Sequence, residues 1–301
     1  MRCPYHGWTF NAEGTCVRVP QFEPDATIPK TYRVQSFQCQ ARYGYAWVCL
    51  DPEPLQPIPA IPEADVAENR LIPQFYEPWK VSGLRLMENS FDNAHFSIVH
   101  AESFGNQEAP QPAKFEIVPQ AVGFKVYSTV PVVNPPSQQR NLGIADTMTM
   151  RHVEATWHRP FSRTLKITYP NRLMHLIYTA ATPIDDQTSQ VVQFCLRNDT
   201  EAEAKAADII AFDRQVTSED RVVLETTDYD APLSTSEEQH MPSDRPGIVM
   251  RHRLAKLLKD HGEVEQRRPE NRPEIAPQGD LKTLRALESS ILGQSQQSQS
   301  Q

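Results

Sequence analysis

Hydrophobic positions change their spacing several times along the chain, which predicts a mixture of strands and helices. Apolar and polar residues alternate over 43–50, as expected for a half-buried strand. Helical patterns cover 86–104, 202–225 and 248–259. Strands followed by a helix, more strands and then helices indicate an α+β organisation. Further strands are predicted over 115–118, 123–130, 165–169, 173–181 and 191–196, and a terminal helix over 281–292.

A proline-dense segment divides the chain. Five prolines fall within 52–62, and each removes a backbone donor and fixes φ, so this segment should be an extended connector. We therefore expect one domain over 1–62, which includes the connector, and a second domain over 63–292. The Gln- and Ser-rich end, 293–301, is expected to be disordered.

Charge and cysteine usage narrow the class of protein. The formal net charge of −8 argues against a general nucleic-acid binder, because phosphate contacts require clustered lysine and arginine. No apolar stretch approaches the length of a membrane span, and no signal peptide precedes Cys3. The five cysteines show no disulfide rhythm, so we expect a reducing, cytoplasmic setting.

The run CPYHGW at 3–8 is the first candidate for chemistry. A thiolate and an imidazole three positions apart, Cys3 and His6, can reach one metal centre from a tight loop, which Pro4 and Gly7 favour. One alternative is a surface cysteine and histidine that bind no metal. Another is a zinc site, in which Cys3 and His6 would be joined by two of Cys16, Cys39 and Cys49.

A second candidate is the segment that contains Asp92, His95 and His100. Two histidines and one carboxylate on one face of an iron leave positions open for O₂ and substrate. His95 and His100 are five residues apart, so a π-type turn or a helix break would be needed to bring both rings to one metal. Asp92 lies three residues before His95, on the same helix face. A histidine pair of this kind in an apolar helix is otherwise more often structural.

The helix predicted over 202–225 offers the third ligand. Asp220 lies four residues after Val216 and three before Val223, within the apolar stripe, where an unpaired carboxylate is unfavourable and a metal would compensate it. This placement favours Asp220 over Glu219, which neighbours the stripe less centrally, and the alternative is a solvated acidic helix face. The carboxylates considered are Asp213, Glu219, Asp220, Glu225, Asp228 and Asp230.

Both segments resemble motifs of the Rieske non-heme iron oxygenases. The run at 3–8 resembles the second ligand pair of a Rieske [2Fe–2S] site, in which two cysteines hold one iron and two histidines the other. The segment from Asp92 to His100 resembles the family motif Asp-x-x-His-x4-His. The resemblance implies that Cys3 and His6 bind the [2Fe–2S] cluster, although the first pair, Cys-x-His, does not occur in this chain. It also implies that His95, His100 and Asp220 bind Fe(II), and that Asp92 links this iron to the cluster of a neighbouring subunit.

The same resemblance implies a fold, an activity and partners. A partial β-rich Rieske domain would precede a catalytic domain with helices packed on a curved antiparallel β-sheet. The enzyme would be a mono- or dioxygenase, with electrons supplied by a ferredoxin or a flavin/iron–sulfur reductase. It would activate O₂ at Fe(II) for hydroxylation, dihydroxylation or oxidative demethylation of an organic, for example aromatic, substrate. Head-to-tail homotrimers are expected. Candidate residues near the substrate are Phe104, Trp157, His158, His175 and Tyr178, although aromatic residues in strands more often belong to the core.

The competing interpretation is a truncated, non-catalytic paralogue or an accessory subunit that binds iron but lacks a complete [2Fe–2S] cluster. The single cluster pair motivates it, and a start codon chosen too far downstream explains that pair equally well. The coexistence of Asp92, His95, His100 and Asp220 argues against decay of the catalytic domain.

Overall fold

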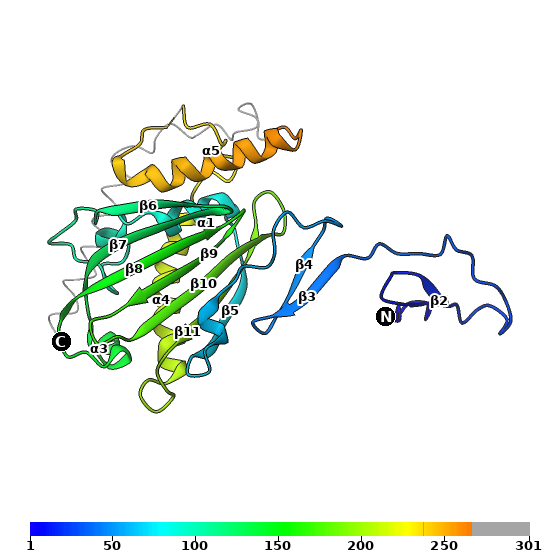
Figure 1. Cartoon of the computed structure of the whole chain (residues 1–301), viewed down its shortest axis with the longest axis horizontal. Coiled ribbons are helices and arrows are strands. Elements are labelled where there is room, and N and C mark those ends of the chain that lie inside the picture. The colour runs from blue at the N-terminus through cyan, green and yellow to red at the C-terminus, as the bar shows by residue number, and fades with distance from the viewer. Residues whose placement is uncertain (237, 267–301) are drawn as a thin grey trace. The chain divides into compact units, whose positions relative to one another are not determined.

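The computed structural model describes residues 1–236 and 238–266, which fall into two compact units (Figure 1). The first unit is Met1–Asp65, and the second begins at Val66. The sequence placed the division at residue 62. The helix predicted over 281–292 and the disorder predicted over 293–301 lie outside the described residues.

The first unit contains two small antiparallel sheets. β1 (Thr9–Phe10) pairs with β2 (Cys16–Arg18), and β3 (Gln38–Arg42) pairs with β4 (Tyr45–Cys49), the strand predicted over 43–50. A short 3₁₀ helix, Pro62–Asp65, ends the unit. Only three hydrophobic side chains are fully buried among its residues: Cys16, Val19 and Ile61. So small a core leaves most of the unit's apolar side chains in contact with solvent.

The second unit is built on a seven-stranded antiparallel sheet in the order β5-β11-β10-β9-β8-β7-β6. β6, β7, β9, β10 and β11 correspond to the predicted strands, whereas β5 and β8 were not predicted. β5 contains Pro73 and Pro78, which an edge strand tolerates because one side of its backbone needs no ladder partner. The strands are β5 (Arg70–Trp79), β6 (Phe115–Gln120), β7 (Gly123–Val133), β8 (Met148–His158), β9 (Ser162–Thr168), β10 (Met174–Pro183) and β11 (Ser189–Arg197).

Side chains alternate between the two faces of this sheet, as the pleat requires. In β8, Arg151 and Ala155 are buried on one face, whereas Met150 and His152 are exposed on the other. The inward face of β8 carries a threonine and an arginine as well as apolar residues. This mixture hides the apolar–polar alternation, which explains why β8 was not predicted.

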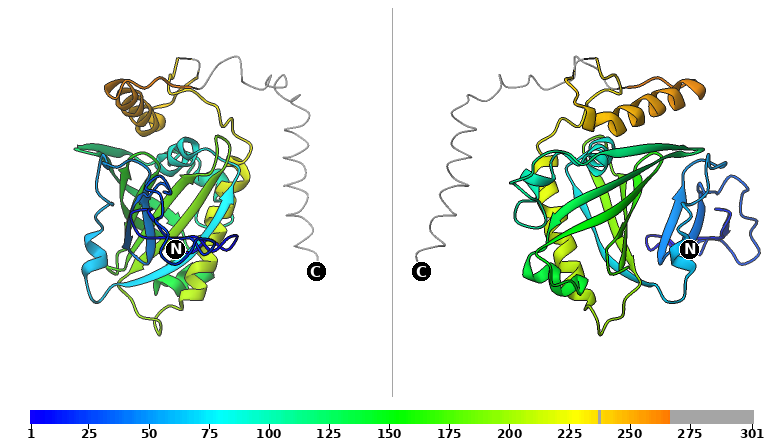
Figure 2. Two further views of the ribbon diagram at one scale, coloured as in Figure 1. Left: turned by 90° about the vertical axis from the view of Figure 1, so that its right-hand side faces the viewer. Right: turned by 60° about the vertical axis from the view of Figure 1, so that its left-hand side comes forward.

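Helices cover the inward face of the sheet. Figures 1 and 2 show α1 and α4 against one side of the curved sheet. A large apolar core lies between these helices, α5 and the strands, and it includes Leu84, Met87, Phe124, Trp157 and Met250. None of the described helices is long and apolar enough to cross a membrane. The helices are α1 (Gly83–Phe91), α2 (Phe96–Val99), α3 (Pro136–Leu142), α4 (Ala206–Leu224) and α5 (Arg245–Asp260), with a 3₁₀ turn at Pro242–Asp244.

The continuous helix predicted over 86–104 is wrong. α1 begins at the N-cap Ser82, whose hydroxyl accepts from the backbone N–H of Arg85, and it ends at Phe91. Asp92 then adopts an extended conformation, with ψ 140°. Its carboxylate accepts from the backbone N–H groups of Ala94 and His95, at 2.8 and 3.3 Å. A side chain that bonds to the backbone ahead of it competes with the helical hydrogen bonds, so the helix breaks here.

Candidate metal centre

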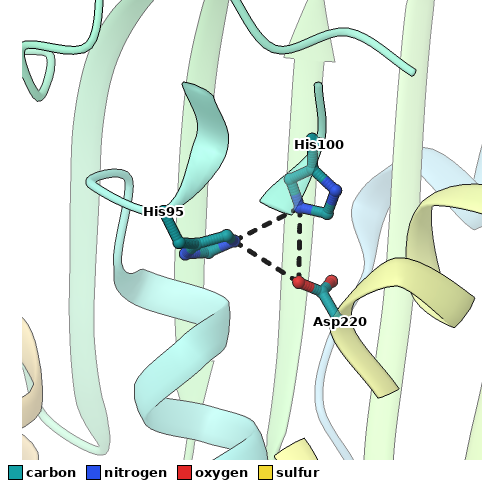
Figure 3. A group of neighbouring side chains, drawn as sticks. All are labelled: His95, His100 and Asp220. Atoms are coloured by element: carbon teal, nitrogen blue, oxygen red, sulfur yellow. Dashed lines mark hydrogen bonds and ion pairs between the residues drawn. The ribbon is translucent and has the colours of Figure 1, made fainter. Parts of the chain in front are cut away.

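Three side chains converge in the second unit (Figure 3). The Nε2 atoms of His95 and His100 are 3.2 Å apart, and Oδ1 of Asp220 lies 3.4 and 3.3 Å from them. Such separations are expected between ligands that share one metal ion at about 2.0–2.2 Å each. Two imidazoles and one carboxylate are the donor set of non-heme iron sites that keep positions open for O₂. The residues present therefore fit a mononuclear iron.

The short helix α2 and the turn after it position the two histidines. His95 precedes α2 and His100 follows it, so the rings do not obey the spacing of one continuous helix. The His100 carbonyl accepts from the backbone N–H of Gly105 at 2.7 Å. A β carbon at position 105 would lie 2.1 Å from the carbonyl oxygen of Phe96, so only glycine allows the chain to approach this closely. The break predicted between the two histidines is not found: it lies before His95, and the short helix α2 separates His95 from His100.

Each histidine is held by a second carboxylate. Nδ1 of His95 lies 2.9 Å from Oδ2 of Asp92, and Nδ1 of His100 lies 2.8 Å from Oε2 of Glu219. The hydroxyl of Ser103 also donates to Glu219, at 2.7 Å. These contacts favour the tautomers with a proton on Nδ1 and leave both Nε2 atoms available to a metal. Glu219 was considered as a ligand, but here it orients His100.

Asp220 reaches the triad from α4. It is fixed by Nδ2 of Asn89 on α1, which donates to Oδ1 at 3.2 Å. Val216, one turn earlier, lines the same cavity, whereas Val223 is 47% exposed. The prediction that Asp220 lies within an apolar stripe therefore holds toward Val216 and is wrong toward Val223.

The charges at the triad favour a cation. Burial alone would lower the pKa of His95, but hydrogen bonds to Asp220 and Asp92 outweigh burial and raise this pKa to about 9. Burial would raise the pKa of Asp220, yet hydrogen bonds from His100 and His95 hold it well below its usual range. A metal ion must displace the proton on His95, so metal affinity should fall as the pH falls.

Family comparisons agree with this geometry. Residues 79–260 match the vanillate O-demethylase oxygenase C-terminal domain, and residues 1–38 match the Rieske [2Fe–2S] domain. The chain belongs to the Rieske non-heme iron oxygenases. The predicted family, the α+β fold and the oxidoreductase class are thereby confirmed. The family comparisons also support oxidative demethylation or hydroxylation as the activity, and a Rieske [2Fe–2S] cluster and a mononuclear iron as the cofactors.

Two demethylases of Pseudomonas putida are similar to this oxygenase over much of its length. The methylxanthine N1-demethylase NdmA is 29% identical over 273 residues, which are 88% of this chain and 73% of that protein. The methylxanthine N3-demethylase NdmB is 26% identical over 242 residues, 79% of this chain and 64% of that protein. The structure of NdmA with caffeine matches with a TM-score of 0.75 at 26% identity, over 88% of this chain and 74% of that chain.

A cavity, partly open to solvent, adjoins the triad of His95, His100 and Asp220. Its walls come from α1–α4 and the inward face of the sheet, and most of the surface that they present to the cavity is apolar. Of the residues predicted to lie near substrate, Phe104 and His175 line it. The other three have different surroundings. Trp157 belongs to the core, Tyr178 stacks on Phe194, and His158 lies 3.2 Å from the hydroxyl of Thr164.

A second buried polar group lies at the same cavity. Oδ2 of Asp213 is 3.1 Å from Nε2 of His175 and also accepts from the amide of Gln74. The same amide lies 3.4 Å from the sulfur of Cys195, whose pKa is raised by burial. Asp213, one of the candidate ligands from the sequence, thus pairs with His175 and not with the iron triad.

Cys3 and His6 lie on a tight loop of the first unit. Backbone hydrogen bonds close the loop, from Cys3 N to the Trp8 carbonyl at 2.8 Å and from Gly7 N to the Cys3 carbonyl at 3.0 Å. Gly7 has φ +77°, a conformation that glycine adopts without strain. Within residues 1–236 and 238–266, neither Cys3 nor His6 joins a group of three metal-ligating side chains. The zinc grouping with other cysteines is thus not formed among these residues, and the role of Cys3 and His6 as cluster ligands stays a prediction.

Proposed function

We propose that His95, His100 and Asp220 bind Fe(II), and that the chain is the oxygenase of an oxidative demethylation or hydroxylation of a small organic, for example aromatic, substrate. One observation carries the proposal. Two imidazole nitrogens and a carboxylate oxygen, 3.2–3.4 Å apart, lie in the wall of a largely apolar cavity. The N-demethylase relatives favour removal of a methyl group from nitrogen or oxygen.

Some residues of the protein orient the metal ligands, and others surround the substrate. Asp92 and Glu219 orient the two imidazoles, so the ligand face is organised before a metal arrives. The apolar walls hold the organic part of the substrate and exclude water from the oxidation site. Iron, when bound, supplies the activation of O₂.

The partners belong to the same proposal. A ferredoxin or a flavin/iron–sulfur reductase would deliver electrons, and a head-to-tail homotrimer would bring a neighbour's cluster close to this iron. The carboxylate of Asp92, which contacts His95, has a side chain that is 27% exposed. A bonded and partly exposed position supports the role of Asp92 as the bridge between subunits.

The test is formaldehyde release by the full chain loaded with Fe(II), in the presence of O₂ and a chemical reductant. Probes with O-methyl and N-methyl groups on aromatic rings cover both kinds of demethylation. We expect formaldehyde that requires iron and O₂ and that is lost in His95→Ala. Tight binding of one iron without oxidation of any probe under single-turnover conditions would instead favour the non-catalytic interpretation.

A further inference from the structure

Arg151 is a buried cation in the wall of the substrate cavity. It points inward from the middle of the sheet, on β8, and is 7% exposed. Its Nε atom is buried and has no hydrogen-bond partner among the described residues. A guanidinium group stays charged even when burial lowers its pKa, as it does here, so this charge requires compensation.

The surroundings of Arg151 supply aromatic rings and no carboxylate. The guanidinium lies 4.2 Å from the centre of the Phe104 ring and 5.7 Å from that of Phe96. The Tyr169 hydroxyl is the acidic group that influences the pKa of Arg151, which it raises. In residues 1–236 and 238–266, Arg151 forms no ion pair with an aspartate or a glutamate.

Other buried arginines of the same unit are compensated. Arg197, 1% exposed, is paired with Asp199, and Arg251, 2% exposed, is paired with both Glu88 and Glu238. Among the described residues, Arg151 differs from both of these arginines, because it has no carboxylate partner. Because it also faces the cavity, the missing anion is most simply one that enters with the substrate.

A second arginine of the cavity provides a contrast. Arg163 on β9 also has buried Nε and Nη1 atoms without hydrogen-bond partners. Burial lowers the pKa of Arg163 to about 10, but the charge of Asp220 opposes this shift. Asp220 thus acts on the pKa of Arg163, whereas no carboxylate acts on the pKa of Arg151.

We propose that Arg151 binds an oxyanion of the substrate, so that the oxygenase acts on small organic acids, with a carboxylate as the simplest case. This inference rests on the proposed function for the location of the reaction. Phe104 and Phe96, which Arg151 contacts, also contact the iron-site residue His100, with ring centres 4.6 and 5.8 Å apart. An aromatic acid held by Arg151 would therefore lie along these rings, with its far end directed to the metal. The nearby Asp213 does not oppose this, because His175 and Gln74 already bind it.

A matched pair of probes tests the charge directly. 4-Methoxybenzoate and 4-methoxybenzamide have nearly the same shape, but only the first is an anion. We expect the full chain to bind the acid at least about tenfold more tightly than the amide, since hydrogen bonds to charged groups contribute the most. Calorimetry under anaerobic conditions, with and without Fe(II), measures binding without turnover, so a failure of the iron site leaves the result readable.

Two variants assign the effect to one residue. Arg151→Met should remove the preference for the acid to within about twofold and leave binding of the amide unchanged. Arg163→Met, a matched loss of a guanidinium from the same cavity, should retain most of the preference. Equal binding of acid and amide by the wild type, or loss of the preference in Arg163→Met alone, would overturn the proposal.

Two further measurements separate binding from folding. Removal of an uncompensated buried charge should leave the melting temperature of ligand-free Arg151→Met unchanged or higher. A lower melting temperature together with an intact acid preference would assign Arg151 to stability instead. Should this variant not fold, Arg151→Lys should keep part of the preference, since it retains the charge but not the planar fork. Inorganic phosphate should bind far more weakly than the acid; equal affinity would mean that the site holds a free anion and not a substrate.

Discussion

The two units of the chain carry metal-ligand sets of opposite kinds. In the first unit, Cys3 and His6 lie three residues apart on one loop, so the pair is formed by local sequence alone. In the second unit, His95, His100 and Asp220 come from segments more than a hundred residues apart and meet only when the sheet and helices have folded. The local pair is shaped by the hydrogen bonds of one loop, whereas the distant set takes its geometry from the packing of α4 against the segment 92–100.

The burial and the hydrogen bonds of the ligand side chains also differ between the two units. His100 is 2% exposed, and its second ring nitrogen is bound by Glu219. His6 is exposed and lies in a unit with only three buried hydrophobic side chains among its residues. Preorganisation requires both a rigid core and bonded second neighbours, and only the second unit provides them.

The largest expected effect is the loss of a triad ligand. Asp220→Ala should weaken Fe(II) binding by more than the roughly 10–100-fold that removal of an outer partner causes. Metal analysis of the full chain after dialysis measures this directly. The matched control is Asp208→Asn, which changes an exposed carboxylate on the same helix, α4, and should leave the iron content unchanged. Normal iron content in Asp220→Ala would mean that Asp220 is not needed to bind iron, and the contrast between the two metal-ligand sets would fail.

Next in size is the loss of an orienting carboxylate. Glu219→Gln keeps an acceptor near Nδ1 of His100 but removes the negative charge, so the affinity for Fe(II) should fall about 10–100-fold. Titration against a competing chelator gives this number. Glu225→Gln changes a carboxylate that binds Arg221 and the backbone of Lys80, away from the triad, and should have no effect. Equal affinities in the two variants would mean that His100 needs no support.

A fall in pH should lower the free energy of unfolding of the second unit, because His158 is buried in it. Burial, with a smaller contribution from Lys125, lowers the pKa of His158 to about 4, from the 6.5 expected in the unfolded chain. Between these values the unfolded state binds more protons, so this stability is present above the unfolded pKa and is lost as the pH falls toward the folded one. Urea denaturation at about pH 8 and about pH 5 should differ by about 2 kcal/mol from this residue. His158→Gln should reduce that difference, and an unchanged difference would contradict the assignment.

The smallest expected effect comes from the first unit. Cys3→Ser removes a cluster ligand, but it lies in the other unit and should leave the iron bound at the triad unchanged. Iron analysis of the wild type and Cys3→Ser side by side measures this. A proportional loss of iron in Cys3→Ser would show that the bound metal depends on the first unit.

Sequence patterns predicted the family and most strands, because motif spacing and apolar runs are local properties; the family motif also pointed to the histidines and the aspartate that meet in the second unit. The helix break at Asp92 was missed as an element boundary because a single side chain, bonded to the backbone of Ala94 and His95, decides it. β8 was missed because Arg151 occupies one of its inward positions. The pairing of Glu219 with His100 joins segments far apart in the chain, and no periodicity records such a contact.

The central claim is that the second unit alone holds a complete mononuclear iron site. X-ray absorption at the iron edge, measured on the full chain loaded with Fe(II) under anaerobic conditions, tests it most directly. The account predicts a shell of nitrogen and oxygen ligands at about 2.0–2.2 Å, with the scattering pattern of imidazole and no neighbouring iron. A sulfur shell at about 2.3 Å, from Cys3 or from Cys195 beside His175 and Asp213, or an iron–iron distance would mean that the metal is not held by the triad, and would contradict the account.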